Sequence, residues 1–249
     1  MDPQLLALLL LIVVLLVWRA VTRERREYAQ FRRMRTTAAR QKVLRRWLIE
    51  SVLVFGGLAA AILLAVWELL PRVLHEAQGW TPIAASREIF LETPFGGILA
   101  ISAGIGVAAI LIVPLVLLRT ATPDEVPTLG DIRALLPRTR GELPYGAGLA
   151  ASAGVLEELV FRLAMPALLF GIWPNAPLAF ALSALLFGVL HLYQRWTGVL
   201  TATVLGIVLS YLYVVSGTIL LPIVLHLLID ARSLVLLPLV LGRVWTKPA

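Results

Sequence analysis

The sequence predicts an all-α membrane protein, a polytopic bundle of about seven transmembrane helices, and composition and patterning both favour this fold. Hydrophobic residues fill 59% of the 249 positions, only 15% are charged, and the mean hydropathy is +0.89. Soluble domains are closer to half apolar and about a quarter charged. Cysteine is absent, which excludes disulfides and thiolate chemistry. His, Asp and Glu are therefore the candidate catalytic or metal-binding side chains.

The apolar residues form runs separated by polar or turn-forming segments. The expected spans are residues 5–18, 47–70, 95–118, 145–170, 176–193, 197–215 and 218–241. The first run is short against the roughly 20 residues that a span requires, so an interfacial helix is the alternative. Its positive charges follow the apolar residues, the reverse of a secretory signal, which predicts a retained anchor. An N-terminus outside and a C-terminus inside place the Lys and Arg clusters on one side.

The segment 19–46 is strongly basic. It contains eleven of the 22 Lys and Arg residues, opposed by Glu24 and Glu27. Beside a membrane span, such a segment is typical of an amphipathic helix on the inner leaflet that binds anionic lipids rather than nucleic acid. Four apolar side chains are expected to enter the leaflet: Tyr28, Phe31, Met34 and Val43.

Two connecting segments divide the chain. Residues 71–94 are expected to form an outer loop in which His75 faces solvent. Residues 119–144 are rich in proline and carry mixed charge, so they mark the expected boundary between an N-terminal anchoring half, 1–144, and a C-terminal membrane core, 145–241.

Three of the four C-terminal spans carry ionisable side chains, which are costly inside a membrane and usually serve function. They include Glu157, Glu158, Arg162, His191, His226 and Asp230. Glu158 and Arg162 lie four residues apart and can pair on one helix face. Glu157 points about 100° away from Glu158, towards a polar cavity or a histidine of another helix, and is a candidate base.

The histidine spans add a second pair. His226 and Asp230 are also four residues apart, and a carboxylate at that spacing can orient an imidazole. The groups are expected to converge in a cavity open to the cytoplasmic side. Structural roles are the first alternative, because a Glu–Arg pair can join two helices and a membrane histidine can be an interhelical hydrogen-bond partner. A transport role is the second, because the set can form the proton relay of a transporter.

Three motifs carry a family resemblance. Residues 157–162 read E-E-x-x-x-R, residues 187–191 read F-x-x-x-H with Phe187 one turn before His191, and residues 226–230 read H-x-x-x-D. In this order they resemble the CPBP (Abi) family of intramembrane endopeptidases, which includes the CAAX-processing proteases. The resemblance covers about 145–241 and implies a helical, glutamate-dependent peptidase of the bacterial plasma membrane. Its substrate would be a peptide or protein, lipidated or membrane-embedded.

The resemblance also implies residue roles. Glu157 and His191 would activate a water, and His226 and Asp230 would stabilise the oxyanion. The supporting positions are Glu158, Arg162 and Phe187. The family hydrolyses peptides without cofactor or metal, although the Glu, His and Asp side chains here suit a divalent metal by ligand type. CAAX-processing members have asparagine at the position of Asp230, and an ionised carboxylate only accepts hydrogen bonds.

A second function remains open on the same scaffold. Some relatives of this family are linked to bacteriocin self-immunity, and a fold does not guarantee its activity. A non-proteolytic membrane interaction or immunity factor is therefore the alternative to an endopeptidase.

Overall fold

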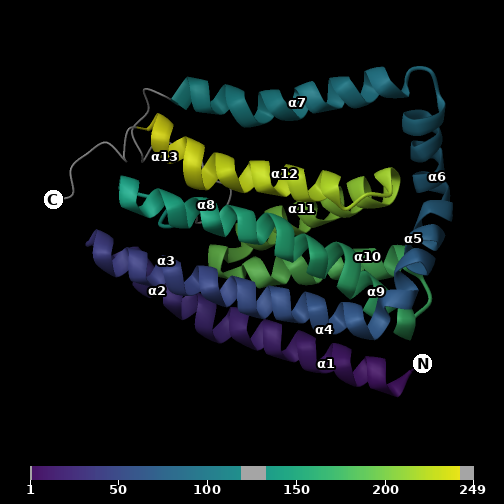
Figure 1. The fold of residues 1–249 in the computed structure, drawn as a ribbon, viewed down its shortest axis with the longest axis horizontal. Coiled ribbons are helices and arrows are strands. Elements are labelled where there is room, and N and C mark those ends of the chain that lie inside the picture. The colour runs from purple at the N-terminus through teal and green to yellow at the C-terminus, as the bar shows by residue number, and fades with distance from the viewer. Residues whose placement is uncertain (1, 119–132, 242–249) are drawn as a thin grey trace.

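The structure, a computed structural model, describes residues 2–118 and 133–241 and is built from helices that run mostly alongside one another (Figure 1). Within these residues no strand occurs, which confirms the all-α prediction. Five helical stretches are long and apolar enough to cross a membrane: Pro3–Arg33, Thr37–Gly79, Gly96–Leu117, Ala176–Ser216 and Leu220–Val240. The count of seven spans and their orientation stay predictions.

The N-terminal half begins with two long helical stretches that lie side by side (Figure 1). The first consists of α1 (Pro3–Trp18), η1 (Arg19–Glu24) and α2 (Arg25–Arg33), and the second of α3 (Thr37–Ser51), η2 (Val52–Gly56), α4 (Gly57–Val66) and η3 (Trp67–Leu69). The single helix expected over 19–46 is interrupted, and its position on the inner leaflet stays a prediction. Residues 19–33 extend α1, and the chain turns at 34–36 before α3 begins.

The expected outer loop 71–94 is also wrong, because most of it is helical. It contains α5 (Leu70–Gly79), α6 (Thr81–Arg87) and η4 (Glu88–Glu92), which lead across one end of the bundle to α7 (Gly96–Leu117; Figure 1). A proline stands in the first turn of α5 and of α6, where its missing N–H costs nothing. His75 is exposed, as predicted.

The C-terminal half contains the remaining helices and the ionisable side chains. Its elements are η6 (Arg140–Glu142), α8 (Leu143–Ser152), η7 (Ala153–Glu157), η8 (Leu159–Ala164), α9 (Met165–Ile172), α10 (Ala176–Leu190), η9 (His191–Gln194), α11 (Arg195–Ser216), α12 (Leu220–Ala231), η10 (Arg232–Leu236) and α13 (Leu237–Val240). The predicted turns at 171–175, 194–196 and 216–217 fall at the helix boundaries. Gly217 takes the left-handed conformation (φ 73°) that ends α11.

One hydrophobic core joins the two halves. Ile12 of α1 and Ile62 of α4 belong to the same buried cluster as Phe161, Leu168 and Tyr213 of the C-terminal half. The N-terminal helices therefore pack directly against the helices that carry the motifs. A domain boundary near residue 144 stays a prediction, and residues 119–132 of the expected connector lie outside the described residues.

A buried ion pair joins the first turns of α3 to η6, which directly precedes α8. Arg40 and Glu142 are both 0% exposed, and Arg40 Nε lies 3.0 Å from Glu142 Oε1. Arg40 Nη2 also donates to the carbonyls of Ala134 and Leu136. Arg40 belongs to the segment expected to bind lipids, yet it is enclosed by protein because it neutralises a buried carboxylate.

The apolar side chains of segment 19–46 are likewise enclosed. Tyr28 is 4% exposed and Phe31 is 0% exposed, and both pack with Leu44 and the half-buried Met34 and Val43. The prediction that these side chains enter the leaflet is therefore wrong for Tyr28 and Phe31, because they pack against protein instead.

Candidate active site

Glu157 and Glu158 lie where two π-helical stretches meet, η7 and η8. π-Helical turns are rare in proteins overall, but those that occur are frequently found at functional sites. Gly154, at the start of this region, faces α12: a Cβ on this residue would lie 2.9 Å from Leu227 Cα. The absent side chain lets η7 approach α12 closely, which brings the two glutamates near His226.

Glu158, Arg162 and His226 form a buried ionic cluster. Glu158 Oε1 accepts a hydrogen bond of 2.7 Å from His226 Nδ1, and Glu158 Oε2 lies 3.0 Å from Arg162 Nε. The three residues are 0%, 1% and 3% exposed in the order named. The predicted pair of Glu158 and Arg162 is confirmed, and Glu158 has a second partner on a helix far away in the sequence.

Phe187 lies at the centre of the aromatic contacts around this cluster. The guanidinium carbon of Arg162 lies 4.7 Å from the centre of the Phe187 ring, a favourable cation–π distance. The rings of His191 and His226 have their centres 4.8 Å and 6.0 Å from the same ring. Phe187 thus packs against both histidines and the arginine, which fits its predicted supporting position.

The four predicted catalytic residues line one cavity. Glu157, His191, His226 and Asp230 all contribute to the wall of a space of about 810 Å³ whose lining is mostly apolar. Glu157 is half-buried there, and within the described residues its carboxylate has no hydrogen bond or ion pair. Glu157 and Glu158 therefore differ: Glu158 has two buried partners, whereas Glu157 faces the cavity.

The histidine tautomers follow from their partners. His191 Nδ1 lies 2.9 Å from the Phe187 carbonyl, which only accepts, so Nδ1 donates and Nε2 keeps its lone pair. By the same reasoning His226 Nδ1 carries the proton that it donates to Glu158. These bonds fix each ring and leave its Nε2 free for chemistry.

Asp230 lies close to His226 but does not make the orienting bond expected from the sequence. Asp230 Oδ2 is 3.7 Å from His226 Nε2, beyond hydrogen-bond distance, and its side chain is 29% exposed. Glu158 orients the imidazole instead, because the packing of η7 on α12 brings its carboxylate to Nδ1. Within residues 2–118 and 133–241, no group of three or more His, Asp or Glu is arranged to hold a metal ion.

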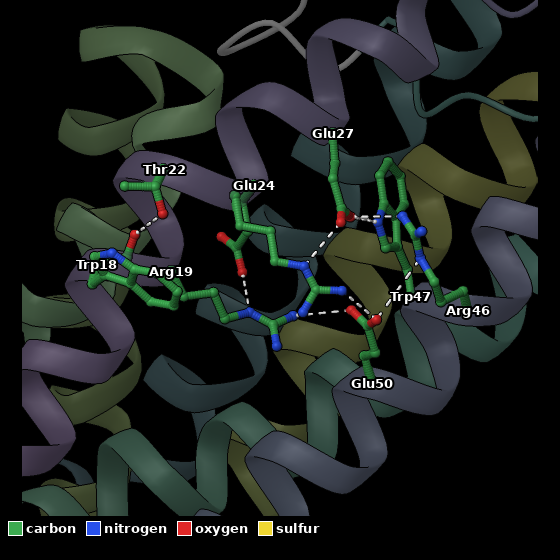
Figure 2. Close-up of polar contacts among 9 residues, drawn as sticks. Trp18, Arg19, Thr22, Glu24, Glu27, Arg46, Trp47 and Glu50 are labelled. Atoms are coloured by element: carbon green, nitrogen blue, oxygen red, sulfur yellow. Dashed lines mark hydrogen bonds and ion pairs between the residues drawn. The ribbon is translucent and has the colours of Figure 1, made fainter.

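A second set of charges, which we call the ionic lattice, joins η1 and α2 to α3 (Figure 2). It consists of Arg19, Arg23, Glu24, Glu27, Arg46 and Glu50. Arg23 contacts both Glu27 and Glu50, and Glu27 also accepts a 2.7 Å hydrogen bond from Trp47 Nε1. Four of these residues line the cavity: Arg19, Arg23, Glu24 and Glu27.

The sequence reasoning missed this lattice, although a signal was present. Arg23 and Glu27, and again Arg46 and Glu50, have the i,i+4 spacing of helix-surface pairs. Part of the basic charge of segment 19–46 is thus used within the protein. Exposed cations of the segment, such as Arg25, Arg33 and Arg45, are the ones for which the anionic-lipid prediction remains.

Comparison with known proteins finds a family match over the part of the chain that carries the motifs. Residues 139–232 match the family described as type II CAAX prenyl endopeptidase Rce1-like. This stretch contains all three motifs and confirms the resemblance to CAAX-processing proteases. Neither the curated proteins nor the solved structures give a match.

Proposed function

We propose that the chain, whose residues 139–232 match the Rce1-like family of type II CAAX prenyl endopeptidases, hydrolyses peptide bonds within the membrane by a glutamate- and histidine-activated water. The family suggests an endopeptidase, and the apolar helices indicate an integral membrane protein. We infer a bacterial plasma membrane and a cavity open to the cytoplasm. The observation that carries the proposal is the shared cavity of Glu157, His191, His226 and Asp230.

In the proposed reaction Glu157 is the base. Its carboxylate takes a proton from a water held by the lone pair of His191 Nε2, and the water oxygen attacks the carbonyl carbon of the peptide bond. The C–N bond then breaks as Glu157 returns the proton to the leaving nitrogen. The Glu157 carboxylate, which has no hydrogen bond or ion pair among the described residues, and the fixed His191 ring support these roles.

The proposed oxyanion donor is His226. As an imidazolium, it keeps Nδ1–H on Glu158 and offers Nε2–H to the negative oxygen that forms during the attack. Arg162 and Phe187 hold Glu158 and the ring in place. Asp230 balances the charge of the imidazolium and, as a carboxylate, does not itself donate.

The central test is Glu157→Gln in the purified chain, reconstituted in lipid vesicles with a farnesylated peptide that ends in a CAAX sequence. Gln keeps the size but cannot accept the proton, so we expect kcat to fall by at least about 100-fold, as for loss of a general base. Mass spectrometry of the released peptide measures the rate. Retained hydrolysis would refute the mechanism.

The same variant separates the alternative function. If cells expressing the chain resist a bacteriocin and Glu157→Gln protects them as well as the wild type, the chain acts as a non-proteolytic immunity factor. Comparative proteomics of wild-type and Glu157→Gln membranes addresses the substrate, because an uncut peptide should accumulate in the variant.

Asp230→Asn tests the account of the oxyanion. The amide resembles the side chain of CAAX-processing members and adds an N–H donor, so we expect kcat to stay within about threefold of the wild type or to rise. A fall as large as that of Glu157→Gln would mean that the Asp230 carboxylate takes part in proton transfer.

A further inference from the structure

Arg232 lines the catalytic cavity and differs from the other arginines there. Among the described residues, Arg19 and Arg23 line the same cavity, but each is paired with glutamates of the ionic lattice. Arg232 has no ion pair within the described part of the chain. Among the residues that the structure describes, its one partner is the Leu111 carbonyl of α7, which accepts a hydrogen bond of 2.9 Å from Arg232 Nε.

The two terminal nitrogens of Arg232 are available. The Nη atoms of Arg162 are sealed inside the protein, whereas those of Arg232 are not, and Arg232 is half-buried. A guanidinium held at Nε still presents both Nη groups as a fork that matches a carboxylate. A cation in a membrane segment is costly without a partner, which points to an anionic ligand.

The other charges that line the cavity explain why an anionic ligand would need a cation such as Arg232 there. Glu157 and Asp230 both line this cavity, and their carboxylates would repel an incoming negative group. Arg232 follows His226 by six residues, a rise of about 9 Å along a helix. An extended peptide covers that distance in about three residues. Six residues also place the two side chains about 120° apart around the helix, so the rise is the shortest separation. A substrate with its cleaved carbonyl at His226 would thus reach Arg232 with a group at least about three residues further on.

We propose that Arg232 binds the carboxylate of the peptide substrate on the C-terminal side of the cleaved bond and thereby determines specificity. This inference rests on the proposed function, with Arg232 as a binding residue outside the proton transfers. The carboxylate can be the free C-terminus or an acidic side chain, since both present the same group. A plain structural role is the competing explanation, because Arg232 also joins η10 to α7 through Leu111.

The test measures cleavage of three farnesylated peptides in zwitterionic vesicles: one with a free C-terminal carboxylate, its amide, and an amide whose last residue is Glu. For the wild type we expect kcat/KM about ten- to a hundredfold higher for a carboxylate peptide than for the plain amide, as for a charged hydrogen bond. The Glu-ended amide decides between the two sources of the carboxylate.

Arg232→Gln should lower this preference to about onefold, and Arg232→Lys should restore part of it. Arg23→Gln is the matched control: it removes another arginine of the cavity wall, and the preference should persist. An equal loss for acid and amide peptides in Arg232→Gln would mean a structural role and overturn the proposal. So would an effect of Arg232→Gln that arises only when anionic lipid is added, since the site would then bind a lipid phosphate.

Measuring peptide binding tests the Arg232 site separately from catalysis. The ratio of Kd values for the acid and amide peptides is measured in Glu157→Gln, which needs no turnover and does not depend on the folded fraction. A ratio that vanishes when Arg232→Gln is added supports the site even if the wild type cleaves neither peptide, in which case the proposed function fails alone. Equal Kd values in Glu157→Gln would overturn the Arg232 site while leaving hydrolysis intact.

Discussion

The buried ionic cluster and the ionic lattice both pair charged side chains, but they do so in opposite ways. In the cluster, one carboxylate, Glu158, serves both Arg162 and His226, and all three residues are enclosed. In the lattice, three arginines and three glutamates share contacts, and their side chains are 17% to 47% exposed. The cluster depends on a single residue, whereas each member of the lattice can be replaced in part by its neighbours or by water.

This difference indicates where the chain tolerates change. Breaking a buried ion pair leaves an uncompensated charge and costs several kcal/mol, whereas an exposed pair contributes about 0–1 kcal/mol. The cluster also orients His226, so its geometry bears directly on the proposed chemistry. The lattice forms a wall of the cavity but does not contact the proposed catalytic residues through any described hydrogen bond.

Glu158→Gln should have the largest effect on stability. The change keeps the shape but removes the carboxylate that pairs with Arg162, whose Nη atoms have no hydrogen-bond partner among the described residues. We expect a loss of about 5 kcal/mol, the upper end for a broken buried pair, and a fall in Tm of at least about 10 °C. Thermal unfolding in detergent measures it.

Two variants sharpen this prediction. Glu157→Gln should leave Tm nearly unchanged, because the Glu157 carboxylate has no described partner to lose. Arg162→Met should cost less than Glu158→Gln, since Glu158 keeps its hydrogen bond to His226. Equal Tm values for Glu157→Gln and Glu158→Gln would show that the cluster does not stabilise the fold.

Arg40→Met tests the buried pair between α3 and η6 and should have the next largest effect. Glu142 would lose its counterion but keep a hydrogen bond from the Arg138 backbone N–H, so we expect about 3 kcal/mol and a fall in Tm of roughly 6–12 °C. Arg45→Met, on the exposed side of α3, is the control and should change Tm little. If both variants unfold at the wild-type temperature, the pair is not part of the stabilising core.

The contrast between the two regions also explains how far the sequence alone could predict the site. Glu158 and Arg162 lie on one helix, and their spacing fixes their geometry. The bond from His226 to Glu158 joins residues 68 positions apart, so it depends on the packing of η7 against α12. Sequence patterning therefore placed both residues in the membrane but named Asp230 as the orienting partner.

The N-terminal half was predicted less well, for a physical reason. Lipid tails and protein interiors are both apolar, so the sequence pattern of a lipid-facing residue also fits a buried one. Phe31 is such a case, because the guanidinium carbon of Arg40 lies 4.2 Å from the centre of its ring. The helices α5 and α6 were missed because the segment 71–94, which contains Pro71 and Pro82, was interpreted as a polar connection between spans. At the first turn of a helix, however, proline is favourable, and both residues lie there.

Arg46→Gln should have the smallest effect and tests the redundancy of the ionic lattice. Arg46 Nη2 lies 2.8 Å from Glu27 Oε2, but its side chain is 47% exposed, and Glu27 keeps Arg23 and Trp47 as partners. We expect a change in Tm within about 2 °C, as for an exposed pair.

Glu27→Gln removes the acceptor that these partners share and should lower Tm further. Since exposed charges are screened, this difference should shrink in 1 M salt, whereas the effect of Arg40→Met should persist. A loss for Arg46→Gln as large as that for Arg40→Met would contradict the redundancy and make the lattice a second structural centre.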